Sequence, residues 1–162
     1  MIDAPLGDRS QWKPKWPELG IYEVPIGKAK VVREGTDATL VSFGRTLPLC
    51  TKLADEMKSD GKSIEVIDLR SLYPYDWQCI KASVLKTKRV MFVNEDTEIT
   101  NFGEHLANRV TRELFYHIHA APRVLAGRNV PGIGLHPNLE DASIPQMPEL
   151  TAETLALLAE QP

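Results

Sequence analysis

From about residue 25 onward, the sequence alternates short apolar segments with segments of helical periodicity. Alternation of this kind within one core specifies a mostly parallel β-sheet with helices packed against it. Five segments are predicted to be strands: Lys28–Arg33, Ala38–Phe43, Ile64–Leu69, Arg89–Val93 and Arg123–Ala126. Because right-handed crossovers place helices on both faces of such a sheet, we expect a three-layer α/β/α domain.

One strand is expected to run against the others. The turn Glu34–Asp37 contains Gly35 and joins the first two predicted strands. A short glycine-containing connection is typical of antiparallel neighbours, so these two strands are predicted to pair with each other. The predicted fold class is therefore α/β, with a five-stranded, mostly parallel sheet that has one antiparallel edge strand. Ligands of such sheets gather beyond the carboxyl ends of the strands.

Apolar residues recur at helical spacing in the segments between the strands. The predicted helices are Leu47–Ser59, a short helix after Asp76, a long helix from about Phe102, and Thr151–Glu160 with Leu155 and Leu158 facing inward. Thr46 and Asp76 are predicted N-caps, and Gly61 stands where a left-handed C-cap is needed. The Pro- and Gly-rich segment Asn129–Pro148 is predicted to be an irregular loop.

Residues 1–24 differ from the rest of the chain. Prolines interrupt the charged residues there, and neither a period of 2 nor one of 3.6 is present. This composition predicts a linker or extended arm, followed by one domain at residues 25–162. Trp12 and Trp16 are predicted to anchor the arm onto a surface. The alternative, a floppy terminus, stays open.

Charge and composition exclude several classes of partner. The formal net charge is −3 and the pI is about 5.8, which argues against a nucleic-acid partner. No apolar run approaches the ~20 residues of a membrane span, and the first residues lack a signal-peptide pattern. Cys50 and Cys79 show no Cys-x-x-Cys spacing, so a disulfide scaffold is not expected and the cytoplasm fits better.

The densest acidic group, Glu95, Asp96 and Glu98, directly follows a predicted strand. Neighbouring carboxylates can do acid–base work or bind a cation, although a solvated surface explains them as well. The turn Gly44–Thr46 could present backbone amides to an anion, or be a plain turn. His117 and His119 would point apart on a helix, and His136 stands alone in a loop. We therefore expect no catalytic, cofactor-binding or metal-binding residue in this chain.

Three segments carry a resemblance to a known family: Pro25–Lys30, Ile64–Asp76 and Leu139–Gln146. They resemble the C-terminal domain of the beta subunit of a 2-oxoacid dehydrogenase decarboxylating component, of the 2-oxoisovalerate or pyruvate dehydrogenase type, with the transketolase C-terminal fold. The resemblance covers roughly residues 21–160.

The resemblance implies a piece of an enzyme that oxidatively decarboxylates branched-chain 2-oxoacids or pyruvate and passes the acyl group to a lipoyl carrier. Thiamine diphosphate and Mg²⁺ then lie between an alpha subunit and the amino-terminal domain of the beta subunit. This chain would bind neither, and the isolated chain would be inactive. Its role would be packing against the alpha subunit, a second beta subunit and the dihydrolipoyl acyltransferase core.

At one position the sequence departs from the family. Many relatives have a His-Glu pair after the strand that ends at Val93, where this chain has Asn94 and Glu95. The interface candidates are Glu95, Asp96, Glu98, Trp12 and Trp16. The competing interpretation is a free-standing α/β anion-binding or regulatory module that uses Gly44–Thr46. The sequence does not decide which 2-oxoacid is the substrate.

Overall fold

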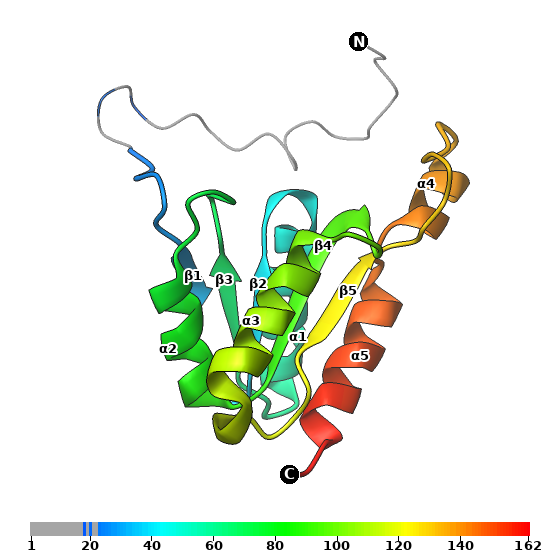
Figure 1. The fold of residues 1–162 in the computed structure, drawn as a ribbon. Coiled ribbons are helices and arrows are strands. Elements are labelled where there is room, and N and C mark those ends of the chain that lie inside the picture. Colours follow the sequence, from blue (N-terminus) through cyan, green and yellow to red (C-terminus); the bar gives the residue numbers. More distant parts are fainter. Residues whose placement is uncertain (1–17, 19, 21–22) are drawn as a thin grey trace.

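A five-stranded sheet forms the middle layer, with the strand order β1-β3-β2-β4-β5 (Figure 1). The structure is a computed structural model that describes residues 18, 20 and 23–162. The strands are β1 (Lys30–Arg33), β2 (Ala38–Ser42), β3 (Ile64–Asp68), β4 (Val90–Thr97) and β5 (Arg123–Gly127). β1 pairs antiparallel with β3, and the other neighbours pair in parallel. The predicted fold class is confirmed.

The predicted pairing of the first two strands is wrong. β1 pairs with β3, and β2 lies between β3 and β4. Every residue of β2 is buried, whereas both ends of β1 are exposed. A strand that is apolar on both sides gains most from a central position, and a strand with polar ends tolerates an edge. Burial across the whole sheet therefore overrides the local turn signal.

The connection from β1 to β2 passes directly against β3 at Gly35. A Cβ atom at Gly35 would lie 2.1 Å from the backbone nitrogen of Glu65 and 2.3 Å from the carbonyl carbon of Ile64. Only a residue without a Cβ allows two backbones to approach this closely. Gly35 thus serves a close approach rather than a hairpin turn.

The helices form the two outer layers. They are η1 (Gly44–Thr46), α1 (Leu47–Ser59), α2 (Trp77–Thr87), α3 (Phe102–Leu114), η2 (Phe115–His117), α4 (Pro137–Ser143) and α5 (Met147–Ala159). α1 and α5 share one hydrophobic core with the sheet, and α2 and α3 share the other (Figure 1). Leu40 of β2 belongs to the first core and its neighbour Val41 to the second, as the alternation of side chains along a strand requires.

Two of the three predicted helix ends are confirmed. The Asp76 carboxylate accepts a hydrogen bond from the Cys79 backbone N–H at 3.2 Å and caps α2. Gly61 follows α1 with a φ of 72°. The Thr46 side chain, however, makes no capping bond. Its buried hydroxyl lies 2.8 Å from Ser42 Oγ and 3.1 Å from the carbonyl oxygen of Val93, so it ties α1 to the sheet instead.

The segment predicted to be an irregular loop, Asn129–Pro148, contains the whole of α4 and the start of α5. Proline is the first residue of α4, where its missing N–H costs no helical hydrogen bond. His136 precedes it and its Nδ1 accepts a hydrogen bond from the Asn138 backbone N–H at 3.3 Å. Two prolines of this segment, Pro137 and Pro148, therefore lie at the starts of helices and do not prevent them.

In α5 the inward face differs from the prediction. Leu150, Thr154 and Leu157 are buried, Leu158 packs partly against the core as predicted, and Leu155 faces solvent. The Thr154 hydroxyl donates to the carbonyl oxygen of Leu150 at 2.7 Å. Because its hydroxyl is hydrogen-bonded within the helix, Thr154 can occupy a core position. A prediction based on apolar residues alone does not place it there.

Candidate assembly surface

The loops that follow the parallel strands gather at one edge of the sheet. We call this the carboxyl edge, and it comprises residues 23–29, 44–46, 69–75, 95–101 and 128–146. β1 runs antiparallel to β3, so its amino end, with residues 23–29, reaches the same edge as the carboxyl ends of the other strands. Figure 1 shows α4 projecting beyond this edge. Sheets of this class present their binding surfaces here.

Glu95 and Asp96 lie within β4 and not in a loop behind it, so the predicted end of this strand at Val93 is wrong. The pairing with β5 moves from Val93↔Leu125 to Thr97↔Gly127, which leaves extra residues on β4 as a bulge. A Cβ atom at Gly127 would lie 2.7 Å from the carbonyl oxygen of Glu95, so only glycine fits against the bulge. Glu95, Asp96 and Glu98 are all exposed.

Asn94 is buried beneath the bulge and forms a reciprocal amide pair with Asn101. Asn94 Nδ2 donates to Asn101 Oδ1 at 2.8 Å, and Asn101 Nδ2 donates to Asn94 Oδ1 at 2.7 Å. Asn101 also caps α3 and forms a capping box with Glu104. Asn94 is thus fully occupied in joining β4 to α3.

Three arginines at or beside this edge are already engaged by the protein. Arg45 forms an ion pair with Glu140 of α4, and Arg128 Nη2 lies 3.2 Å from Glu149 Oε1. Arg70 donates to the backbone carbonyl oxygens of Lys28 and Ala29 at 3.1 and 3.2 Å. The turn Gly44–Thr46 therefore offers an incoming anion neither a free guanidinium nor a free hydroxyl.

Large apolar side chains are concentrated at the carboxyl edge. Of the twelve that are exposed in the described chain, nine lie here: Val24, Ile26, Leu72, Tyr73, Ile99, Val130, Ile133, Leu135 and Leu139. Tyr73 is 92% exposed and Leu135 is 89% exposed. Exposed apolar residues scattered singly are ordinary, but a concentration at one edge marks an interaction surface. The sequence signal for this surface was the apolar content of residues 129–148.

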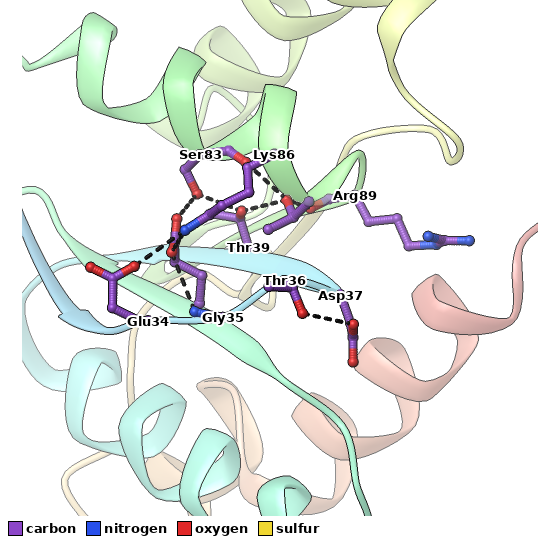
Figure 2. Close-up of polar contacts among 10 residues, drawn as sticks. Glu34, Gly35, Thr36, Asp37, Thr39, Ser83, Lys86 and Arg89 are labelled. Carbon is purple, nitrogen blue, oxygen red and sulfur yellow. Dashed lines mark hydrogen bonds and ion pairs between the residues drawn. The ribbon is translucent and has the colours of Figure 1, made fainter.

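Sequence reasoning missed a buried polar cluster at the opposite edge of the sheet (Figure 2). Glu65 of β3 is 1% exposed and accepts hydrogen bonds from Lys86 Nζ, from Ser83 Oγ and, at 3.3 Å, from the Gly35 backbone N–H. Figure 2 shows Ser83 and Lys86 reaching from α2 toward the turn at Glu34 and Gly35. A charged residue between the apolar residues Ile64 and Val66, at the start of a predicted strand, was the available signal.

The electrostatics of this cluster favour the charged forms of Glu65 and Lys86. Burial alone would raise the pKa of Glu65, but hydrogen bonds from Lys86, Ser83 and Gly35 outweigh burial and hold this pKa below its usual value. The hydrogen bond to Glu65 raises the pKa of Lys86. A carboxylate with a lowered pKa is a weak base, and its donors occupy the oxygens that would accept a proton, so we interpret the cluster as structural.

The described residues do not fit Mg²⁺–thiamine diphosphate. Among residues 18, 20 and 23–162, no group of three or more His, Cys, Asp or Glu side chains is placed to hold a metal ion. A diphosphate also needs cationic donors, and the arginines of the carboxyl edge are engaged as described above. His117 and His119 are exposed beyond α3 and form no such group.

Two of the interface candidates, Trp12 and Trp16, lie outside the described residues, as does most of the predicted arm. The boundary between arm and domain at residue 24 therefore stays a prediction. In the part of the chain that is described, no helix has the length and apolar character needed to cross a membrane.

Comparison with known proteins identifies the family. The model of the transketolase C-terminal domain matches residues 27–150. The chain is 37% identical over 134 residues to the pyruvate dehydrogenase E1 component subunit beta of Rhizobium meliloti, covering 83% of this chain and 29% of that protein. It is 34% identical over 119 residues to the 2-oxoisovalerate dehydrogenase subunit beta of Bacillus subtilis, covering 74% and 36%.

A solved structure has the same fold. The split-gene transketolase in an inactive beta4 tetramer superposes with a TM-score of 0.75 at 21% identity, over 87% of this chain and 45% of that chain. The chain thus spans about a third of the length of the curated relatives named above. The resemblance seen in the sequence is confirmed, and the chain belongs to the transketolase C-terminal domain family.

Proposed function

We propose that the chain is the C-terminal domain of the beta subunit of a thiamine-diphosphate-dependent 2-oxoacid dehydrogenase, and that it serves assembly rather than chemistry. The observation that carries the proposal is the gathering of exposed apolar side chains at the carboxyl edge. The names of the relatives support it, since both are beta subunits of such dehydrogenases. The substrate would be pyruvate or a 2-oxoisovalerate-type branched-chain oxoacid.

The proposed partners are those that the resemblance to such beta subunits implies. They are the alpha subunit, a second beta subunit and the dihydrolipoyl acyltransferase core, in the cytoplasm and without nucleic acid or membrane. The cofactor and Mg²⁺ would be held by the alpha subunit and the amino-terminal domain of the beta subunit. Glu95, Asp96 and Glu98 belong to the proposed interface, where exposed charges steer association more than they set affinity.

The competing interpretation, a free-standing anion-binding module, has less support. It depends on Gly44–Thr46, where Arg45 is paired with Glu140 and the Thr46 hydroxyl is buried against Ser42 and Val93. An anion there would gain a side-chain contact only by displacing these, and would otherwise rely on the backbone amides of the turn alone. The apolar character of the same edge suits a protein partner better.

A chimera tests the proposed function. Residues 25–162 replace the C-terminal domain of the Bacillus subtilis 2-oxoisovalerate dehydrogenase subunit beta, which is co-expressed with its alpha subunit. We expect the chimera to co-purify with the alpha subunit and to support lipoyl-dependent decarboxylation. Assembly is expected to fail in the edge variant Tyr73→Ser/Leu135→Ser/Leu139→Ser.

A control variant removes three exposed apolar side chains elsewhere. Phe115, Tyr116 and Leu155 are exposed but lie on η2 and α5, away from the carboxyl edge. The chimera with Phe115→Ser/Tyr116→Ser/Leu155→Ser is expected to assemble. If the edge variant assembled as well as this control, or if a folded chimera never bound the alpha subunit, the proposed function would be wrong.

A further inference from the structure

We propose that the outer face of α3 carries a binding site for the phosphate group of a small phosphate monoester. A pocket of about 360 Å³ opens there, and we call it the α3 pocket. Its volume lies at the lower end of the range for sites that bind small organic molecules. The pocket is lined by Tyr75, His105, Asn108, Arg109, Arg112 and Glu113. The inference goes beyond the proposed function and does not depend on it.

The spacing of polar residues along α3 builds most of the pocket. His105, Arg109 and Arg112 stand at i, i+4 and i+7, so they share one face of the helix. α2 and α3 cover the same face of the sheet (Figure 1), and Tyr75 enters the pocket from the connection that leads into α2. The other face of α3 is buried in the core through Leu106, Val110 and Leu114.

Arg109 is held in place before any ligand arrives. Its guanidinium carbon lies 4.2 Å from the centroid of the Trp77 ring, and Trp77 is buried. Arg109 Nε donates to Glu113 Oε1 at 2.8 Å, and Arg109 Nη1 donates to the Tyr75 hydroxyl at 2.7 Å. The same hydroxyl lies 2.9 Å from His105 Nε2. A side chain that is already ordered loses little conformational freedom on binding, so the cost of binding falls.

The pocket also contains donor groups that the protein does not use. Of the eight arginines in the described chain, Arg112 is the one whose side chain makes no hydrogen bond or ion pair with another described residue. Arg109 Nη2 and the side-chain amide of Asn108 likewise donate to no described residue. Three cations at this site, Lys81, Arg109 and Arg112, are opposed by Glu113 alone. Such an excess of positive charge attracts an anion.

Glu113 does not block the pocket. Its carboxylate accepts hydrogen bonds from Arg109 Nε at 2.8 Å and from Trp77 Nε1 at 2.9 Å, and it lies 3.9 Å from Lys81 Nζ. The negative charge of Glu113 is therefore compensated by its own partners. Arg112 keeps its charge for a ligand.

The unused donors suit a phosphate group better than a carboxylate. A phosphate monoester carries roughly −1.5 to −2 charges at pH 7 and presents three acceptor oxygens, whereas a carboxylate carries one charge and has two oxygens. Guanidinium groups pair with phosphate oxygens through parallel N–H donors. Asn108 and Arg109 lie one turn before Arg112 on α3, so their donors reach a ligand from more than one direction. A tetrahedral group can accept such an arrangement.

An NMR titration of the full-length ¹⁵N-labelled chain tests the site. The Trp77 indole N–H is the reporter, because Arg109 stacks on its ring and Glu113 accepts its proton. Its signal is the one that is missing from the spectrum of Trp77→Phe. The probes are glycerol 3-phosphate, inorganic phosphate and acetate, at pH 7 and constant ionic strength.

We expect glycerol 3-phosphate and inorganic phosphate to give saturable shifts of the Trp77 indole signal and of the Arg109 and Arg112 backbone amides. Acetate is expected to give none. Binding of acetate with equal affinity would overturn the proposal, as would binding of inorganic phosphate without the ester or the absence of saturable shifts.

Arg112→Gln tests the donor that the protein leaves unused. Its guanidinium contacts no described residue, so the variant is expected to fold as the wild type does. We expect glycerol 3-phosphate to bind about tenfold more weakly, the loss of one charge-assisted hydrogen bond. Lys58→Gln is the matched control, since it removes one exposed positive charge from α1, on the other face of the sheet, and is expected to leave the Kd unchanged. Equal effects of the two substitutions would mean general charge attraction and would overturn the site.

Discussion

Asn94 and Asn101 each donate one side-chain hydrogen bond to the other, at 2.8 and 2.7 Å, and so join β4 to the amino end of α3. Both residues are buried. A Cβ atom at Gly103 would lie 2.8 Å from Asn101 Oδ1 and 3.1 Å from Asn94 Nδ2. The amide pair therefore also requires glycine at position 103. This relationship leaves neither of the two buried side-chain amides without a partner.

Asn94→Ala is expected to lower the free energy of unfolding by about 1–3 kcal/mol, because it leaves the buried Asn101 amide without a partner. Urea denaturation measures the change. Asn108→Ala removes an exposed amide from the same α3 helix and is expected to change stability by less than about 0.5 kcal/mol. Equal effects of the two substitutions would show that the amide pair contributes nothing.

Glu65→Gln is expected to flatten the loss of stability in acid. The pKa of Glu65 is lowered by folding, so its contribution is fully present above the unfolded value of about 4.3 and is lost as the pH falls through the folded pKa. The difference between wild type and variant should therefore shrink below about pH 4. Denaturation curves measured from neutral pH down to pH 2 check this, and parallel curves would contradict it.

Lys86→Met tests the alkaline side of the same pair. The hydrogen bond to Glu65 raises the pKa of Lys86, so its contribution is present below the unfolded value of about 10.4 and is lost as the pH rises through the folded pKa. The variant is expected to be less stable than wild type at neutral pH because a buried carboxylate loses its cation. Above about pH 10.4 the two proteins should converge in stability.

Gly35→Ala is expected to destabilise the fold by about 1–3 kcal/mol or more, because the new methyl group meets backbone atoms of β3 that cannot rotate away. Gly132→Ala is the matched control, since no atom lies within 4 Å of a Cβ there. The control is expected to change stability by less than about 0.5 kcal/mol. Thermal unfolding of the two variants side by side gives the comparison.

The isolated chain is expected not to bind thiamine diphosphate and to self-associate through its carboxyl edge. Calorimetry with the cofactor and Mg²⁺ checks the first expectation, and micromolar binding would overturn the assigned role. Sedimentation velocity checks the second, with the Tyr73→Ser/Leu135→Ser/Leu139→Ser variant expected to shift toward monomer because it removes exposed apolar area. A wild type that stays monomeric at high concentration would contradict the second expectation.

The sequence by itself determined the fold class and most of the elements, but not α4, the start of α5 or the end of β4. The buried strands, the spacing of Leu106, Val110 and Leu114 on α3, the Asp76 cap and the Gly61 helix end are all local signals, and the structure has them where the pattern indicated. Each of these features depends on residues only a few positions apart in the chain, so the local sequence is enough to predict it.

The tertiary structure decided which strands became neighbours and which polar groups were buried together. The pairing of β1 with β3, the bulge at Glu95 and Asp96, and the Asn94–Asn101 pair each depend on burial or on partners supplied by another element. Glu65 is a charged residue in a buried strand, and Lys86 and Ser83 of α2 supply hydrogen bonds to its carboxylate. Desolvation makes such groups costly unless paired, and the pairing partner is chosen by the packed sheet and not by the neighbouring residues in the chain.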